Sequence, residues 1–246
     1  IMQLATRAVP TCFSDIGYAA RYAPTLEAAM RIQVRNQILR QNICGLSLDL
    51  SDRNPRLVWA VTPVDADYLS VMMEFFLGSY AKFCSQLRKS ASGAVRVTFQ
   101  HEPRFDREHY HLSYGCPVEF GCDVTSVEFD THAFEASLPG ARPDIVEQGV
   151  VNFNKSAQWL VEGREHMAHG YFYLSTQLNK SSLTIERMAA AFGLSERTLR
   201  RRLVDEGLAF RDLIDEVRRD MCELYRMEGA RSLSEVAELL GYAELS

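Results

Sequence analysis

Three arginines on one face of a predicted helix are the residues whose type and spacing indicate the most specific chemistry. Residues 195–203 read Ser-Glu-Arg-Thr-Leu-Arg-Arg-Arg-Leu, and Ser195 has the side chain of a helix N-cap. Arg197, Arg200 and Arg201 are spaced i, i+3 and i+4, so a helix would present them together. The guanidinium fork fits a phosphate or the O6/N7 edge of guanine. The pattern therefore predicts a cationic surface for nucleic acid.

The same segment has an inward side and one ambiguous residue. Leu199 and Leu203 are four residues apart and would face the core. Arg202 has two interpretations, a position beside the core or a contact with a phosphate. The alternative for the whole run is an ordinary solvated helix face, which is what isolated runs of charge usually form.

An internal repeat places this helix within a two-helix motif. Residues 185–195 (IERMAAAFGLS) match residues 233–243 (LSEVAELLGYA) at an offset of 48. Both copies have apolar residues at i, i+3 and i+7, an alanine at i+4 and a glycine four residues later. Alanine permits a close helix crossing, and glycine takes the positive φ of a tight turn. Two unrelated amphipathic helices ended by glycine remain the alternative.

Charge is distributed unfavourably for DNA except on the arginine helix. The chain has a net charge of −5 and a pI of about 5.7, and residues 181–246 hold ten arginines against thirteen acidic residues. Acidic residues gather on the next predicted helix, 210–227, which would join the two repeats as a spacer. A DNA contact requires these acids to point away from the phosphates. They are Asp212, Asp215, Glu216 and Asp220.

The C-terminal sequence resembles the DNA-binding module of the AraC/XylS family of transcription regulators. The resemblance rests on residues 189–203, Glu206-Gly207, Phe210, Arg218 and residues 232–246. It implies that Arg197, Arg200 and Arg201 stand where the family contacts bases. The full set that we expect to contact double-stranded DNA is Ser195, Arg197, Thr198, Arg200, Arg201 and Arg202.

The N-terminal sequence predicts an α+β domain with a largely antiparallel sheet. Apolar spacing indicates helices at 25–40, with Thr25 as N-cap, and at 65–87. Strands are predicted at 45–50 and 56–61, joined by a turn, and at 94–99 and 126–130. Residues 15–20, 24–26, 101–103 and 114–121 resemble the arabinose-binding-like sensing domain of the family's ornithine and virulence regulators. This resemblance implies a small-molecule effector, to which the sequence assigns no residue.

These observations predict three regions. They are an α+β effector-sensing domain at 1–143, a helical linker or dimerisation element at 144–178 interrupted by Gly149, Gly163 and Gly170, and an all-α helix-turn-helix domain at 179–246. A second reading helix would begin near Ala243, so we expect the second helix-turn-helix to be truncated. The chain opens on Ile1 rather than on methionine, so we also expect residues to precede it.

Other candidate sites are less specific. A metal site is conceivable where His101, Glu102, Asp106, Glu108, His109 and His111 crowd together, but His109 and His111 would point apart on a helix. The aromatic and methionine side chains of the second predicted helix have two interpretations, the lining of an effector pocket or core packing. They are Met72, Met73, Phe75, Phe76, Tyr80 and Phe83.

No nucleophile elbow, phosphate loop or metalloprotease motif occurs in the sequence. We therefore expect that the protein is not an enzyme and binds no cofactor or metal. The sequence has no run of about 18 apolar residues, and its six cysteines are spaced singly. Both features predict a cytoplasmic protein. We also expect a homodimer. The rival hypothesis is a small-molecule-binding or enzymatic α+β domain with a helical tail for protein contacts.

Overall fold

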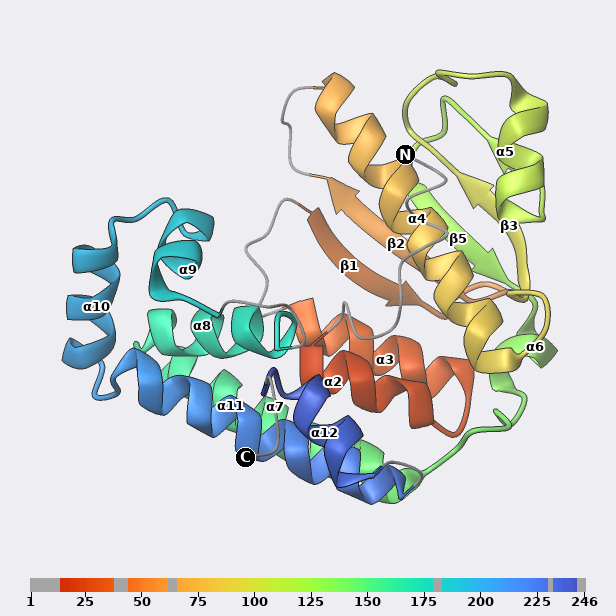
Figure 1. The fold of residues 1–246 in the computed structure, drawn as a ribbon. Coiled ribbons are helices and arrows are strands. Elements are labelled where there is room, and N and C mark those ends of the chain that lie inside the picture. The colour runs from red at the N-terminus through yellow and green to blue at the C-terminus, as the bar shows by residue number, and fades with distance from the viewer. Residues whose placement is uncertain (1–13, 38–43, 62–65, 179–182, 230–231, 243–246) are drawn as a thin grey trace. The chain divides into compact units, whose positions relative to one another are not determined.

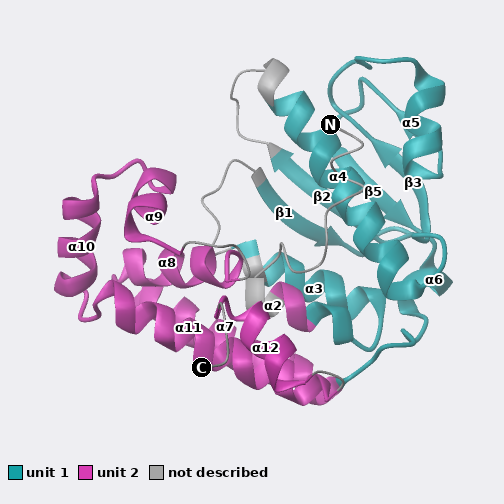
Figure 2. Cartoon of the chain, in the orientation of Figure 1, with its two compact units in different colours: residues 1–10, 20–37, 41–142 teal, residues 11–19, 38–40, 143–246 magenta. Residues whose placement is uncertain are grey.

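The computed structural model describes residues 14–37, 44–61, 66–178, 183–229 and 232–242 (Figure 1). The chain forms two compact units (Figure 2). Unit 1 holds residues 1–10, 20–37 and 41–142, and unit 2 holds residues 11–19, 38–40 and 143–246. The N-terminal helix α2 (Ser14–Ala19) therefore groups with the C-terminal helices rather than with the sheet.

Unit 1 is an α+β fold around a five-stranded sheet of order β1-β2-β5-β3-β4. The predicted hairpin is β1 (Cys44–Asp49) with β2 (Arg56–Val61), and β5 (Thr125–Phe129) lies between β2 and β3 (Ala94–Thr98). Only β4 (Val118–Glu119) pairs in parallel, with β3. The predicted α+β class with a largely antiparallel sheet is confirmed.

The helices of unit 1 follow from caps and apolar stripes. They are η2 (Ala20–Tyr22), α3 (Leu26–Asn36), α4 (Ala66–Arg88), α5 (Arg107–Tyr114) and α6 (Thr131–Glu135). The predicted cap is confirmed, because Thr25 accepts a hydrogen bond from the Ala28 amide at 3.1 Å. Gln37, at the end of α3, bonds through its side chain to both the N–H and the C=O of Leu46 at the sheet edge. The predicted residues 38–40 of this helix lie outside the described residues.

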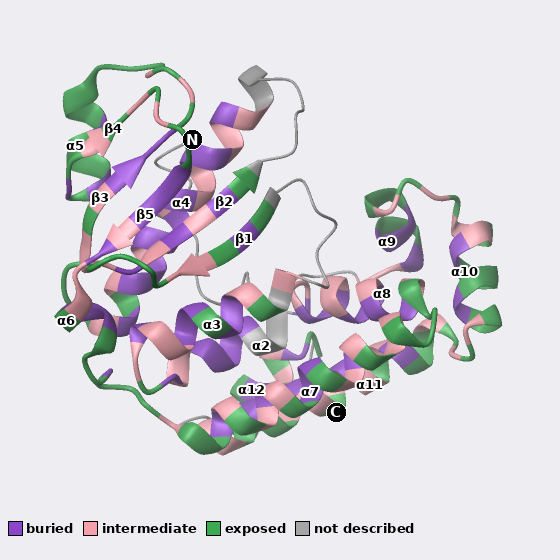
Figure 3. Cartoon of the chain, turned by 180° about the vertical axis from the view of Figure 1, so that it is seen from behind, coloured by how far each residue is buried: buried purple, intermediate pink, exposed green. Residues whose placement is uncertain are grey.

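Helix α4 covers one face of the sheet (Figures 1 and 3), and several of its aromatic and methionine side chains pack in the core. Met73, Tyr80 and Phe83 are at most 2% exposed, and Tyr80 meets Trp59 of β2 edge to face at 5.3 Å. Core packing therefore accounts for these three side chains. The other aromatic and methionine side chains of the predicted set are half-buried, namely Met72, Phe75 and Phe76.

The histidine- and acid-rich stretch joins a buried hydrogen-bond network. Glu74 of α4 is 1% exposed and accepts from Tyr110 Oη at 2.8 Å, with His101 Nε2 at 3.3 Å. Tyr114 donates to the Glu74 carbonyl at 2.8 Å. Burial, together with the hydrogen bond to Glu74, raises the pKa of Tyr110 to about 12. No group of three or more potential metal ligands occurs among the described residues.

The described cysteines outside β1 are free thiols: Cys84, Cys116, Cys122 and Cys222. Burial raises the pKa of Cys84 to about 12 and that of Cys116 to about 11, so both stay protonated at neutral pH. None of the helices in the described ranges is long and apolar enough to cross a membrane.

Unit 2 is entirely helical in its described part. After α2 it contains α7 (Pro143–Val161), α8 (Glu165–Ser175), α9 (Ile185–Ala191), α10 (Glu196–Asp205), α11 (Phe210–Glu228) and α12 (Leu233–Leu239). Helix α11 packs against both α7 and α8.

The prediction that three glycines interrupt residues 144–178 was wrong for two of them. Gly149 and Gly170 lie inside α7 and α8, and only Gly163, with φ +75°, separates these helices. A Cβ at Gly170 would stand 2.4 Å from Met188 Cε and 2.9 Å from Leu213 Cδ2. The glycine thus allows α9 and α11 to approach α8, which is a requirement of packing and not of chain breaking.

A charged network joins three helices of unit 2. Lys155 of α7 donates to Glu216 of α11 at 2.8 Å and also bonds to Asp220, which accepts from Tyr171 of α8 at 2.7 Å. The hydrogen bond from Lys155 is the main cause that lowers the pKa of Glu216 below its usual value. Two of the acids that count against DNA binding therefore share a lysine within the unit.

This network predicts a pH dependence of stability. A carboxyl with a lowered folded pKa stabilises the fold above its unfolded pKa, about 4.3, and that stabilisation is lost as pH falls through the folded pKa. Lys155→Met should lower the free energy of unfolding near neutral pH by roughly 1 kcal/mol, and the difference from wild type should shrink toward about pH 3. Urea unfolding of both proteins across this range measures it. A difference that is constant with pH would contradict this role of Lys155.

Candidate nucleic-acid interface

Helices α9 and α10 form a helix-turn-helix whose turn is centred on Gly193. Gly193 has φ +64°, and its amide donates to the Ala190 carbonyl at 3.2 Å. The Leu194 amide donates to the Ala189 carbonyl at 2.9 Å. These two bonds form a Schellman turn, which ends α9 and leads the chain directly into α10.

The internal repeat reproduces these bonds at the expected offset. The Tyr242 amide donates to the Ala237 carbonyl and the Gly241 amide to the Glu238 carbonyl, each at 3.0 Å. The caps also correspond, because Thr184 accepts from the amide of Arg187 and Ser232 from that of Glu235. The repeat in sequence is therefore a repeat in backbone structure. The predicted second reading helix lies outside the described residues.

The two copies differ in what surrounds them. A Cβ added at Gly193 would meet nothing within 4 Å, whereas one at Gly241 would stand 2.4 Å from the Leu178 carbonyl oxygen. Arg218 of α11 holds the second turn, donating to the Leu240 carbonyl at 3.1 Å and lying 4.4 Å from the ring centre of Tyr242.

Helix α10 is oriented by its buried side. Leu199 and Leu203 are fully buried, as are Met188 and, to 4% exposure, Ile185 of α9. This is the packing that the apolar spacing predicts, and Phe192 and Leu194 at the turn are half-buried. Because the leucines occupy one side, the helix must direct the opposite side outward, where Figure 3 shows exposed residues in green.

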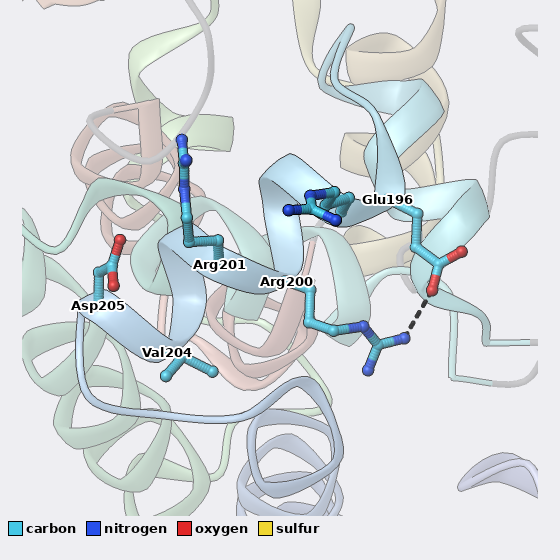
Figure 4. A pocket seen from close by; sticks show the side chains of 6 residues that line it. Glu196, Arg200, Arg201, Val204 and Asp205 are labelled. Carbon is cyan, nitrogen blue, oxygen red and sulfur yellow. Dashed lines mark hydrogen bonds and ion pairs between the residues drawn. The ribbon is translucent and has the colours of Figure 1, made fainter.

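The outward side gathers the arginines in a shallow hollow of about 580 Å³ (Figure 4). Arg197 and Arg201 are exposed and form no ion pair with any described residue. Arg200 extends toward Glu196, and its Nη2 lies 2.6 Å from Glu196 Oε1. The lining consists of Glu196, Arg197, Arg200, Arg201, Val204 and Asp205. One helix thus brings together the three arginines that spacing predicted.

Ser195 and Thr198 have a structural task at this surface. Ser195 Oγ accepts from the Thr198 amide at 3.2 Å and lies 2.8 Å from Thr198 Oγ1. Both hydroxyl groups are therefore engaged in the cap that starts α10.

Arg202 points away from the other arginines and toward α8. Its Nη1 lies 2.7 Å from His166 Nε2, and His166 Nδ1 lies 2.5 Å from Glu206. The Glu206 carboxylate also accepts from the amides of His166 and Met167, at 3.1 and 2.8 Å. Glu206 thus caps α8, whose own N-cap residue, Arg164, supplies no side-chain bond. Arg202 is exposed and lies against His166 of α8 rather than in the core, and its contact with a phosphate stays a prediction.

Glu196 and Val204 are members of the surface that sequence reasoning missed. Val204 is 58% exposed and continues the spacing of the arginines at i+7 from Arg197, so the helical period could have indicated it. Glu196 stands one turn before Arg200, where an i, i+4 pair is expected.

The comparison with known proteins identifies the class. Residues 2–138 match the family described as "Arabinose-binding domain of AraC transcription regulator, N-term", which is more than half of the chain. The chain therefore belongs to the AraC family of transcription regulators, as the sequence resemblance implied.

Individual relatives agree with this family. The chain is 24% identical to the HTH-type transcriptional regulator VirS of Mycobacterium tuberculosis (strain ATCC 25618 / H37Rv), over 98% of this chain and 66% of VirS. It is 23% identical to the HTH-type transcriptional regulator VqsM of Pseudomonas aeruginosa, over 56% of this chain and 43% of VqsM. The chain thus spans less than two thirds of the length of these relatives. The crystal structure of the transcriptional regulator CdpR from Pseudomonas aeruginosa has a similar fold, with a TM-score of 0.52, 22% identity, and coverage of 99% of this chain and 79% of CdpR.

The two turn glycines give a matched test of the repeat. Gly193→Ala should cost about 1–2 kcal/mol, the strain of a Cβ at positive φ. Gly241→Ala should cost more, because the same strain is joined by a clash with the Leu178 carbonyl. Urea unfolding of both variants measures the difference in the free energy of unfolding. Equal losses would show that the turn of α12 does not press on Leu178.

Proposed function

We propose that this chain regulates transcription by binding double-stranded DNA through the outward face of α10, under the control of a small molecule sensed by unit 1. The observation that carries the proposal is the arginine face itself: Arg197, Arg200 and Arg201 project from a leucine-anchored, glycine-turned helix, and two of them have no ionic partner among the described residues. Guanidinium groups held in this way are available to DNA.

The geometry suits the major groove of the duplex. In a helix-turn-helix the N-terminal residues of the second helix contact base edges. Arg197, Arg200 and Arg201 lie in the first six residues of α10. A fork directed at guanine O6 and N7 reads sequence, and the same fork on a phosphate supplies affinity without sequence.

The electrostatics of unit 2 support the proposal despite the negative charge of the chain. Glu216 and Asp220 are turned to Lys155, and Glu216 also meets Arg219 at 2.6 Å. Asp215 lies 4.0 Å from Arg218. Three acids of α11 are thus paired with cations, while Arg197 and Arg201 keep their charges free for phosphate or base.

The sensing part of the proposal rests on the family and on a buried polar side chain of unit 1. Gln33 of α3 is 1% exposed, and neither its Oε1 nor its Nε2 has a hydrogen-bond partner among the residues that the structure describes. A buried amide without partners is costly, so a ligand or a water that bonds to it would be favoured. We infer that Gln33 contacts the effector, and that the effector shifts the population of DNA-competent arrangements by binding one of them more tightly.

The remaining features of the proposal follow from its DNA target. A regulator of this kind acts in the cytoplasm, where the DNA is, and a homodimer would present its reading faces to two half-sites. The function requires no catalytic chemistry. The rival function, a small-molecule-binding or enzymatic domain with a helical tail for protein contacts, makes no use of the arginine face.

A salt titration tests the proposal. If arginines neutralise phosphates, the logarithm of the association constant for duplex DNA should fall linearly with the logarithm of salt concentration, with a slope of about −0.9 per contact. Fluorescence anisotropy with a labelled duplex measures it on the 246-residue chain. Absence of DNA binding at low salt would favour the rival function.

Arg201 and Arg202 form a matched pair for mutation. Arg201→Ala should weaken binding to the preferred DNA site by about 1–3 kcal/mol and relax the base preference there. Arg202→Ala should leave the base preference intact, since its guanidinium lies against His166. Competition binding with preferred and scrambled duplexes measures both. An equal loss on all sequences for Arg201→Ala would assign that arginine to a phosphate, and altered base preference for Arg202→Ala would contradict its assignment to α8.

A further inference from the structure

A carboxylate stands among the arginines at the end of α10 that is proposed to enter the groove. Glu196 is the first residue of α10, its side chain is 43% exposed, and it lines the same hollow as Arg197, Arg200 and Arg201 (Figure 4). A negative group is unexpected on a surface that serves only to attract phosphates, since it repels them. In the first turn it is favoured by the helix macrodipole and by the i, i+4 pair with Arg200. Any favourable contact that it makes with DNA must therefore be with a hydrogen-bond donor.

The major groove offers a carboxylate few favourable contacts. Guanine presents the acceptors O6 and N7 there, and thymine presents the acceptor O4, both of which repel a carboxylate. Cytosine presents the N4 amino donor, which is the usual partner of glutamate, and adenine presents the N6 amino donor next to the acceptor N7. A glutamate at this position therefore favours cytosine and penalises guanine and thymine.

The ion pair with Arg200 reduces the desolvation cost of placing the Glu196 carboxylate against a base. Glu196 Oε1 accepts from Arg200 Nη2 at 2.6 Å, so the carboxylate keeps a cationic partner when water is displaced. Arg200 has five N–H donors, and one bond to Glu196 leaves donors for guanine. The two side chains can thus act together, Arg200 on guanine and Glu196 on cytosine.

We propose that Glu196 is a specificity-determining residue that reads the amino group of a cytosine adjacent to the guanine contacted by Arg200. The inference rests on the proposed function and deepens it, because it names a base that the site must contain. It also gives the negative charge a purpose: binding to non-cognate DNA is weakened, so the ratio of specific to non-specific affinity increases.

Selection from a library of random duplexes tests the proposal. The 246-residue chain and its variants Glu196→Ala, Glu196→Gln and Arg200→Ala are each used to enrich DNA, and the base frequencies at every position are compared. Asp212→Ala is the matched control, since it removes one exposed carboxylate from α11, outside the hollow. Circular dichroism establishes that each variant is folded.

The expected result separates three effects. Glu196→Ala should reduce the preference for cytosine at one position by roughly five- to tenfold, and this position should differ from the guanine lost in Arg200→Ala. Glu196→Gln should shift the preference at that position toward adenine, whose N6 and N7 suit an amide. Non-specific affinity should increase in Glu196→Ala, and Asp212→Ala should retain the cytosine preference.

Other outcomes overturn the inference in distinguishable ways. If the wild-type chain enriches a sequence and Glu196→Ala enriches the same one, Glu196 does not read a base. If Glu196→Ala loses only the guanine that Arg200→Ala also loses, Glu196 merely positions Arg200. If the wild-type chain enriches no sequence at all, the proposed function itself fails together with the inference.

Discussion

The left-handed turn at Gly193 is the constraint on which the arginine face depends. Two backbone hydrogen bonds close the turn and set the direction in which α10 leaves α9. Leu199 and Leu203 on one side of α10 are completely buried, so the opposite side faces outward. The positions of the arginines are thus a consequence of apolar packing, and the cationic groups need no ionic partners to hold them in place.

The distribution of charge within unit 2 is as important as its sum. A net negative balance would oppose DNA if it were spread evenly, yet Lys155 gathers Glu216 and Asp220 between helices. Pairing reduces the field of these acids at distances beyond the ion pairs themselves. On the surface of α10, Arg197 and Arg201 stay unpaired among the described side chains.

Helix α10 is also tied to its scaffold at its C-terminal end. Arg202 contacts His166, and Glu206 caps α8 by accepting from its first amides. These bonds connect α10 to α8, and α8 in turn approaches α9 and α11 closely at Gly170. A change in the position of α8 would therefore move the arginine face.

The sequence by itself determined the features that depend on short-range bonds. The repeated turns, the cap at Ser195 and the arginine spacing all involve residues within a few positions of one another, so the local pattern of types specifies them. Tertiary structure decided what depends on distant partners. Position 170 requires glycine because α9 and α11 leave no room for a Cβ, and Arg202 turns to α8 because His166, 36 residues away, offers an acceptor. No local pattern contains these neighbours, since they are brought close only by the packing of the helices.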